Sequence, residues 1–213
     1  GTQRQMMRAR TGMMRLNYIF LTHLHADHIL GIPGLLETMA FQGRVEPITI
    51  AGPIHTARLV ECFNSVCYFS RNFEVIALEL SPEDVVKMKG YQVRAIETRH
   101  SVPSLGYVLE EDQRLGRFDR DAAISLGVPP GPLFGRLQHG HEVAVEGRVV
   151  QPQQVMGPPR PGRKVVYTGD TRPCRSVEDA GRGADLLIHD SALASDMIEW
   201  AMETKHSTAK EAA

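Results

Sequence analysis

The feature that most constrains the fold of this chain is a group of polar side chains set between two apolar segments, in the stretch FLTHLHADHILGIPGLL at residues 20–36. The run before the group, Tyr18–Thr22, has a β-type composition, and apolar residues recur at roughly helical spacing from Ile29 to Phe41. The polar group therefore lies at a strand-to-helix junction. Such junctions are loops, and loops are where protein sites are usually built.

The polar group has the composition of a metal site. Side chains alternate along an extended segment, so His23 and His25 project to the same side and can bind one cation. Asp27 and His28 follow at the turn, and such a sequence can serve two adjacent metal ions. A mixed imidazole and carboxylate ligand set fits Zn2+ best, with Mn2+ or Fe as alternatives. The simpler interpretation is a solvated His-rich loop, but the spacing directly after an apolar strand argues against it.

Two further metal ligands are predicted where later strands end. His100, in ETRHSVPSLGY, and Asp170, in YTGDTRP, each follow a strand candidate. Either residue alone is more typical of a cap or a turn, but together with the first group they indicate a metal site. A carboxylate such as Asp170 can bridge two cations about 3.5 to 4 Å apart and leave a shared water as a hydroxide nucleophile. The chemistry indicated is hydrolysis of a phosphodiester or acyl bond.

Strand and helix candidates interleave along the chain, which favours an α/β layered fold. The remaining strand candidates are PITIAG (47–52), YQVRAIET (91–98), LGYVLEE (105–111), EVAVEG (142–147), KVVYTGD (164–170) and DLLIHD (185–190), and helix candidates lie at 28–41, 53–69, about 82–88 and near the C-terminal end. Residues 110–163 are the exception, because Gly, Pro, Arg and Gln dominate there. The segment LGVPPGPLFGRLQHG (126–140) predicts a projecting arm or long functional loop, without a regular helix or central strand.

Composition excludes several classes of protein. The 213 residues are 42% apolar and 23% charged, as in soluble globular domains, with 24 Lys and Arg against 25 Asp and Glu. The near-zero net charge gives no global basic field, so any contact with nucleic acid must be local. No apolar run approaches the roughly 18 residues of a membrane span, and the start GTQRQMMRARTG lacks the apolar core of a signal peptide. With three cysteines and no CxxC pair, we expect a cytoplasmic protein without a membrane partner.

The motifs resemble those of a known family. THLHADH resembles the signature of the metallo-β-lactamase superfamily, and the longer string HLHADHILGIPGLL resembles its tRNase Z (ribonuclease Z) branch. Further segments resemble that branch and occur in the same order along nearly the whole chain. They are GTQRQMMRA, which stands before this string, and RHSVPSLGY, LGVPPGPLFGRLQHG, YTGDTRP, LLIHD and HSTAKEAA, which stand after it. The resemblance implies an α/β fold, the αββα sandwich of two packed mixed β-sheets flanked by helices. It also implies a single domain over residues 1–213 that includes a tRNA-binding arm at 111–160.

The resemblance further implies a zinc-dependent endoribonuclease that removes the 3′ trailer from precursor tRNA by metal-hydroxide attack on the phosphodiester. Two Zn2+ would be bound per chain. One ion would be held by His23, His25 and His100, the other by Asp27 and His28, and Asp170 would bridge the two. Asp27 would also orient the hydroxide.

Other roles implied by the resemblance fall on the later motifs. His206, in the motif HST, would protonate the leaving oxygen or stabilise charge on the phosphate. Asp190 stands where the family usually has Glu and would accept a hydrogen bond from His206. The arm would grip tRNA through its shape and backbone. The residues expected to do so are Gly127, Pro129, Pro130, Gly131, Pro132 and Arg136, with Arg114, Arg117 and Arg120 available for phosphates.

Two alternative functions stay open at this point. One is a small-molecule phosphodiesterase of the same fold, and the other is a non-catalytic RNA-binding or dimerisation subunit. Family members commonly form homodimers, and the apolar segments at 35–41 and 57–69 suit that arrangement. Members of the family also have an opening β-hairpin before GTQRQMMRA and a further metal-binding His after the motif HST. We therefore expect an internal fragment whose seventh metal ligand lies beyond Ala213.

Overall fold

The structure is a computed structural model that describes residues 2–66 and 71–213. It divides into two compact units, one made of the chain up to Leu109 together with Lys164–Ala213, and the other made of Glu110–Arg163. The segment expected to form the arm lies within the second unit. Among the described residues, every helix is too short or too polar to cross a bilayer.

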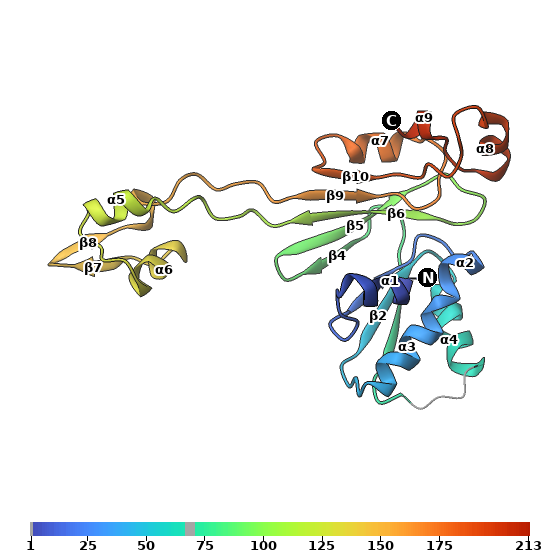
Figure 1. The fold of residues 1–213 in the computed structure, drawn as a ribbon, viewed down its shortest axis with the longest axis horizontal. Helices are drawn as coiled ribbons and strands as arrows, with labels where there is room; N and C mark the ends of the chain where they lie inside the picture. Colours follow the sequence, from blue (N-terminus) through green and yellow to red (C-terminus); the bar gives the residue numbers. More distant parts are fainter. Residues whose placement is uncertain (1, 67–70) are drawn as a thin grey trace. The chain divides into compact units, whose positions relative to one another are not determined.

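The smaller sheet of the first unit is parallel and has the order β1 (Tyr18–Phe20), β2 (Ile48–Gly52) and β3 (Val75–Glu79). Alternate residues of β2 face opposite sides of the sheet. Ile48 and Ile50 are fully buried in one apolar cluster with Leu36 and Met39, whereas Ala51 belongs to a second cluster on the other side. The helices beside the first face are α1 (Thr2–Ala9), α3 (Gly31–Phe41) and α4 (Thr56–Val66) (Figure 1).

The larger sheet of the first unit has five strands in the order β10-β9-β6-β5-β4. Its strands are β4 (Val85–Met88), β5 (Tyr91–Glu97), β6 (Leu105–Glu111), β9 (Lys164–Tyr167) and β10 (Leu186–Ile188). It is mixed, because β4 pairs antiparallel with β5 while β9 pairs parallel with β10. Ala95 and Tyr107 pack towards the smaller sheet, in the cluster that contains Ala51.

The opposite face of the larger sheet is covered by helix α7 (Arg175–Gly181). Ile96, Val108 and Val166 of this sheet are buried against Val177 and Ala180 of the helix. The first unit is therefore layered as helices, sheet, sheet and helix. Three short helices complete the unit, namely α2 (Ala26–Ile29), α8 (Ile198–Thr204) and α9 (Ala209–Ala212).

The second unit has its own apolar core. Its elements are α5 (Arg120–Ser125), α6 (Pro132–Gln138), the hairpin of β7 (Val143–Val145) and β8 (Arg148–Val150), and the 3-10 helix η1 (Pro152–Gln154). The buried residues are Ala123, Val128, Leu137, Val143, Val150 and Val155. The two chain segments that lead into and out of the unit pair with each other, through bridges between Arg114 and Arg160 and between Phe118 and Met156.

Two of the secondary-structure predictions are wrong. The helix expected at 82–88 is strand β4, which forms a hairpin with β5 through Gly90, a residue with φ +89°. The segment 126–140, expected to lack a helix, contains α6, because Pro132 occupies its first turn, where a missing N–H costs little. The helix expected at 53–69 spans 56–66, and residues 67–69 of that prediction lie outside the described part of the chain. Strand β3 and helix α7 were not expected.

Candidate metal and catalytic centre

The predicted ligands come from three chain segments that meet at one edge of the first unit. His23 and His25 follow β1, and His28 lies in α2 directly after them. His100 follows β5, and Asp170 follows β9. The end of β1 is joined to the larger sheet, because Leu105 N donates to Thr22 O at 2.8 Å and the Tyr107 hydroxyl donates to Leu21 O at 2.5 Å. The two sheets thereby bring ligands from distant parts of the sequence together.

The side chains form three groups with the geometry of metal ligands. His23, His25 and His100 form the first group, His23, His28 and Asp170 form the second, and His100, Asp170 and His206 form the third. Within each group the ligand atoms lie within 4.8 Å of one another. The closest approaches are 3.3 Å between His100 Nε2 and His25 Nδ1, and 3.2 Å between His28 Nε2 and Asp170 Oδ2. His23, His100 and Asp170 each belong to two of the groups, so these three side chains join the groups into one centre.

The burial and hydrogen bonding of the His23 ring show whether these residues fit a cation. Its side chain is 0% exposed, and its Nε2 has no hydrogen-bond partner among the described residues. A buried polar atom without a partner costs free energy, so such an atom needs an explanation. The other ring nitrogen, Nδ1, lies 3.1 Å from Thr22 Oγ1. When Nδ1 donates to that hydroxyl, the lone pair of Nε2 is directed to Asp170 Oδ2, 3.7 Å away. A divalent cation would satisfy both atoms.

The protonation state of His23 agrees with this fit. Burial lowers the pKa of His23 to about 3, and the neighbouring imidazoles of His28, His100 and His25 add to the shift. The ring is therefore neutral at pH 7, which is the form that binds metals. Together with the carboxylate of Asp170, this donor set suits Zn2+ and, less closely, Mn2+ or Fe.

Asp27 lies at the margin of these groups. Its Oδ2 is 3.4 Å from His28 Nε2, but its side chain is 81% exposed. It belongs to none of the three groups found among the described residues. Asp27 thus pairs with His28 at the margin of the centre, whereas Asp170 Oδ2 lies within 4.0 Å of His23, His28 and His206.

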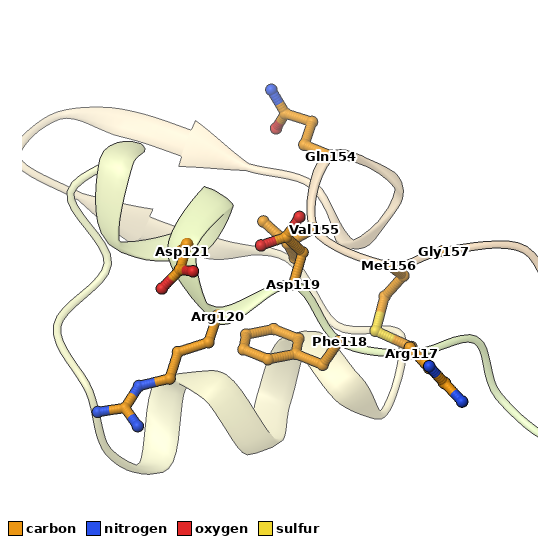
Figure 2. A pocket seen from close by; sticks show the side chains of 9 residues that line it. All are labelled: Arg117, Phe118, Asp119, Arg120, Asp121, Gln154, Val155, Met156 and Gly157. Carbon is orange, nitrogen blue, oxygen red and sulfur yellow. The ribbon is translucent and has the colours of Figure 1, made fainter.

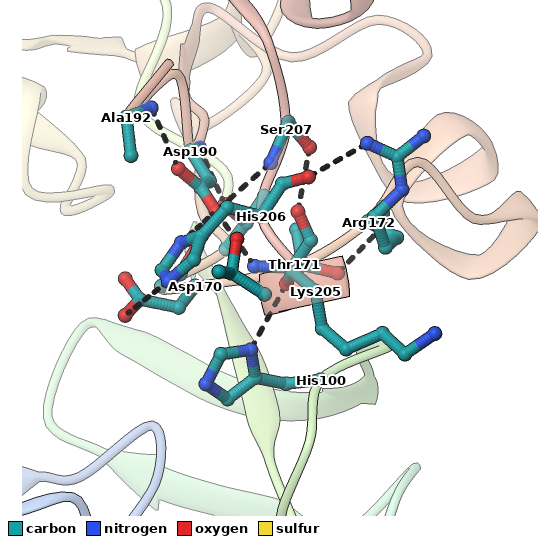
Figure 3. A network of polar contacts seen from close by, with 12 residues as sticks. His100, Asp170, Thr171, Arg172, Asp190, Ala192, Lys205, His206 and Ser207 are labelled. Atoms are coloured by element: carbon teal, nitrogen blue, oxygen red, sulfur yellow. Dashed lines mark hydrogen bonds and ion pairs between the residues drawn. The ribbon is translucent and has the colours of Figure 1, made fainter. Parts of the chain in front are cut away.

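A second polar network lies beside the metal ligands (Figure 3). His206 Nδ1 is 2.9 Å from Asp190 Oδ2, and the Asp190 carboxylate is 3% exposed. The backbone N–H groups of Thr171 and Ser207 donate to the same Oδ2, at 3.0 and 3.3 Å. Ala192 N donates to Oδ1 at 3.0 Å. The hydrogen bond that was expected between Asp190 and His206 is thus present in the structure.

Several residues of this network were not singled out in the sequence. His100 Nδ1 lies 3.0 Å from the carbonyl oxygen of Lys205, so the backbone before His206 orients a predicted metal ligand. The hydroxyl of Ser207 donates to Thr171 O at 2.5 Å. Arg172 Nη1 donates to His206 O at 2.7 Å. The only sequence signal for these residues is their position next to Asp170 and His206.

The predicted arm residues lie in the second unit. Gly127, Pro129, Pro130, Gly131, Pro132 and Arg136 are all exposed. Gly127 has φ +85° and Gly131 has φ +147°, which are conformations that L side chains rarely adopt.

The same unit contains a cavity of about 540 Å³ beside α5, with Arg117, Phe118, Arg120 and Met156 in its wall (Figure 2). None of the six predicted arm residues lines this cavity.

Comparison with known proteins gives consistent matches. A family profile described as "Beta-lactamase superfamily domain" matches residues 2–117. Proteins named ribonuclease Z from Methanosarcina acetivorans and Methanosarcina mazei are 58% and 57% identical to this chain over 213 residues, covering all of this chain and 70% of each relative. Among solved structures, human tRNase Z, short form, matches with a TM-score of 0.66 and 25% identity, over 99% of this chain and 71% of its own. A metallo-beta-lactamase fold protein from Bacillus subtilis, at 16% identity, has a TM-score of 0.58.

Proposed function

Because the chain belongs to the ribonuclease Z family of the β-lactamase superfamily, we propose that it is a metal-dependent endoribonuclease that removes the 3′ trailer from precursor tRNA. The family and the αββα fold class expected from the sequence are confirmed by the same comparisons. The observation that carries the proposal is the buried His23 Nε2, which has no hydrogen-bond partner among the described residues and faces Asp170. A metal-dependent hydrolase would use this buried, unpaired nitrogen to bind a cation, whereas a purely structural core has no use for it.

The ligand assignment keeps the residues expected from the sequence. His23, His25 and His100, which form the first group, would hold one Zn2+. His28 would hold the second with Asp27, whose Oδ2 lies 3.4 Å from His28 Nε2, and Asp170, a member of the second and third groups, would bridge the two. When bound, two such cations lower the pKa of water and stabilise charge on the attacking and leaving oxygens of an in-line displacement. Mn2+ or Fe are the alternatives that the same ligands allow.

The chain's own residues supply the proton transfer. Because Asp190 Oδ2 accepts from His206 Nδ1, the other nitrogen, Nε2, is the atom that can hold or move a proton on the Asp170 side. Water adds to phosphorus as the bond from phosphorus to the leaving 3′ oxygen breaks. His206 Nε2 gives its proton to that oxygen, and the proton that water loses returns through solvent. The products are a tRNA with a 3′-hydroxyl and a trailer with a 5′-phosphate.

The second unit would bind the tRNA body. Its exposed arginines include Arg117, Arg120 and Arg136, and arginine is well suited to backbone phosphates. Recognition of shape and backbone fits a substrate class whose members share a fold and differ in sequence. A phosphodiesterase for small substrates has no need of this unit, which is why we favour tRNA.

Cellular context follows from the same proposal. We also propose that the protein acts on precursor tRNA in the cytoplasm. Homodimer formation is also part of the proposal, with the exposed Phe41, at the end of α3, as a candidate contact. Leu35, Leu36 and Met39 of the same segment are buried in the core and do not take part.

The test is cleavage of a precursor tRNA transcript that carries a 3′ trailer. We expect one cut directly after the discriminator nucleotide, loss of cleavage with a chelator, and recovery with Zn2+. Hydrolysis of a small phosphodiester without tRNA cleavage would favour the small-molecule phosphodiesterase. RNA binding without bound metal or hydrolysis would favour the non-catalytic subunit.

A further inference from the structure

Arg172 is the most extensively bonded side chain next to the centre that has no role in the proposed reaction. It follows Asp170 by two residues, and its side chain is 14% exposed. Nη1 donates to His206 O at 2.7 Å and to Glu211 Oε2 at 2.8 Å, and Nη2 pairs with Glu211 Oε1. The guanidinium thus binds the backbone of His206 and a carboxylate five residues further along.

The backbone of Arg172 contacts a third segment. Its N–H donates to Arg99 O at 2.8 Å, and Arg99 N donates to Thr171 Oγ1 at 2.9 Å. Arg99 directly precedes His100, a predicted metal ligand. Arg172 therefore connects the segments that carry Asp170, His100 and His206.

Glu211 is itself fixed in place. It forms a capping box at the start of α9, in which Glu211 Oε2 accepts from Thr208 N at 3.0 Å and Thr208 Oγ1 accepts from Glu211 N at 3.3 Å. The hydrogen bond from Arg172 lowers the pKa of Glu211 to about 2, so the carboxylate is ionised at neutral pH. A charge-assisted, bidentate ion pair of this kind restricts the guanidinium to one orientation.

The turn that these contacts hold also carries the reactive histidine. It runs from Lys205, which adopts φ +61°, to Thr208. The carbonyl of Lys205 faces His100, the ring of His206 faces Asp190, and the carbonyl of His206 faces Arg172. The Asp190 bond fixes the tilt of the His206 ring. The backbone of His206 is held on one side by its N–H, which donates to Ala201 O at 3.0 Å, and on the other side by Arg172, which binds its carbonyl.

We propose that the Arg172–Glu211 pair is a positioning clamp that holds the backbone of His206, so that its Nε2 meets the leaving oxygen. The inference rests on the proposed function, because it concerns the proton transfer in that reaction. An ordinary structural ion pair would affect stability alone. A positioning clamp affects kcat, leaves KM and metal content unchanged, and matters only when the leaving group needs a proton.

The experiment uses two precursor tRNAs that differ in one atom, the bridging 3′ oxygen of the scissile bond or a sulfur in its place. A thiolate leaves without being protonated. For Arg172→Gln we expect kcat on the oxygen linkage to fall about 10- to 100-fold, the range seen when partners of site residues are removed, with near wild-type kcat on the sulfur linkage. Arg172→Lys should give partial rescue, and His206→Ala should show the same selectivity with a larger loss.

The matched control is Arg94→Gln. Arg94 is also partly buried, at 24% exposed, and forms an ion pair with Glu83 in the β4–β5 hairpin. This variant should cleave both linkages at the wild-type rate. Equal losses on the two linkages in folded, metal-loaded Arg172→Gln would overturn the clamp, as would full activity on the oxygen linkage.

Two additions keep the test decisive. If Arg172→Gln fails to fold, Glu211→Gln serves in its place. It removes the carboxylate charge that pairs with Arg172, while a Gln can still complete the capping box. This variant must also lose kcat on the oxygen linkage and keep it on the sulfur linkage.

The NMR signal of the His206 Nδ1 proton, held by Asp190, gives a readout that needs no activity. We expect faster exchange of this proton with water in Arg172→Gln and no change in Arg94→Gln, and an unchanged signal in both would overturn the proposal. A wild-type protein that cuts no precursor tRNA would instead contradict the proposed function.

Discussion

His23 is the residue on which the account of the centre depends most, and its burial gives a pH dependence. Its pKa falls from 6.5 to about 3 in the folded protein, so between these values the unfolded chain binds a proton that the folded chain does not. The free energy of unfolding of the metal-free protein should therefore decrease as the pH falls below 6.5, by up to about 1.4 kcal/mol per pH unit from this residue. Urea unfolding between pH 7.5 and 5 measures the slope.

The control for this slope is His55, which is exposed and lies outside the cluster. His55→Asn should keep the wild-type slope, because this exposed side chain takes no part in the cluster around His23, and Asn tolerates the φ of +78° found there. His23→Gln should reduce the slope. A wild-type slope that His23→Gln leaves intact would show that another group is responsible.

His25 supplies a prediction about activity. Its ring packs edge-on against His23 and lies beside His100, so His25→Ala removes one ligand from the first group and leaves the apolar core intact. We expect at least an about 100-fold loss of precursor tRNA cleavage, since even loss of a ligand's partner costs 10- to 100-fold. Kinetics with zinc analysis measures it, and substantial cleavage by this variant would contradict the two-metal mechanism.

At the residue scale, the predicted metal ligands could be proposed from the sequence for a physical reason. Four of these residues lie within six positions, and His100 and Asp170 follow strands whose ends converge at one edge. The contacts of Lys205 and Arg172 could not be read in the same way. They involve backbone carbonyls, which every residue carries, so they depend on the fold of the turn around His206.

At the scale of the element, the errors arose where local composition and tertiary context disagree. Residues 85–88, predicted as part of a helix, form a strand because they pair with β5, and the β-branched Val85 and Val86 suit a pleated surface. Helix α6 forms in spite of three nearby prolines because two of them precede it and the third opens it. Leu137 of α6 is fully buried in the core of the second unit, and that burial adds stability which no short helix has by itself.

The paired segments that enter and leave the second unit make a prediction about glycine. A Cβ at Gly116 would lie 1.8 Å from Gly157 O, so the two backbones approach more closely than any other residue allows. Gly116→Ala should destabilise this pairing. Hydrogen exchange at the amides of Arg114 and Arg160, which bond each other's carbonyls, measures the effect.

Gly135, inside α6, is the matched control. A Cβ there meets nothing within 4 Å, so Gly135→Ala should stabilise the helix by up to about 1 kcal/mol. Faster exchange at Arg114 and Arg160 is expected in Gly116→Ala alone. Equal exchange in the two variants would show that the close approach is not maintained in solution.

At the scale of the whole molecule, the two compact units allow substrate binding and chemistry to be separated. The chain enters and leaves the second unit at neighbouring points, since Glu111 N donates to Arg163 O at 2.9 Å. A short Gly-Ser linker can therefore replace the residues between them while the metal ligands and the cores of the first unit remain. We expect hydrolysis of a small phosphodiester to persist and the affinity for precursor tRNA to fall, measured as Kd by filter binding.

The two quantities to compare in this variant are the loss of affinity for precursor tRNA and the loss of small-phosphodiester hydrolysis. Binding through phosphates should also lose its salt dependence when the arginines of the second unit are removed. Equal losses of tRNA binding and small-substrate hydrolysis would mean that this unit supports the fold of the first.

The layered architecture was predictable because interleaved strands and helices have few packing solutions. The separate core of the second unit was not, because its apolar residues are spaced irregularly among Gly and Pro. Val128 and Leu137, for example, join one core only because the chain bends at Gly131 and then forms α6.

The most direct measurement is to map the 3′ end produced from a precursor tRNA by the wild-type protein and by His25→Ala, each with and without a chelator. The account predicts a single tRNA product that ends in a 3′-hydroxyl at the discriminator nucleotide, formed only by the wild-type protein and only when metal is present. Cleavage that persists in His25→Ala or in the presence of the chelator, or cuts scattered along the trailer, would contradict it.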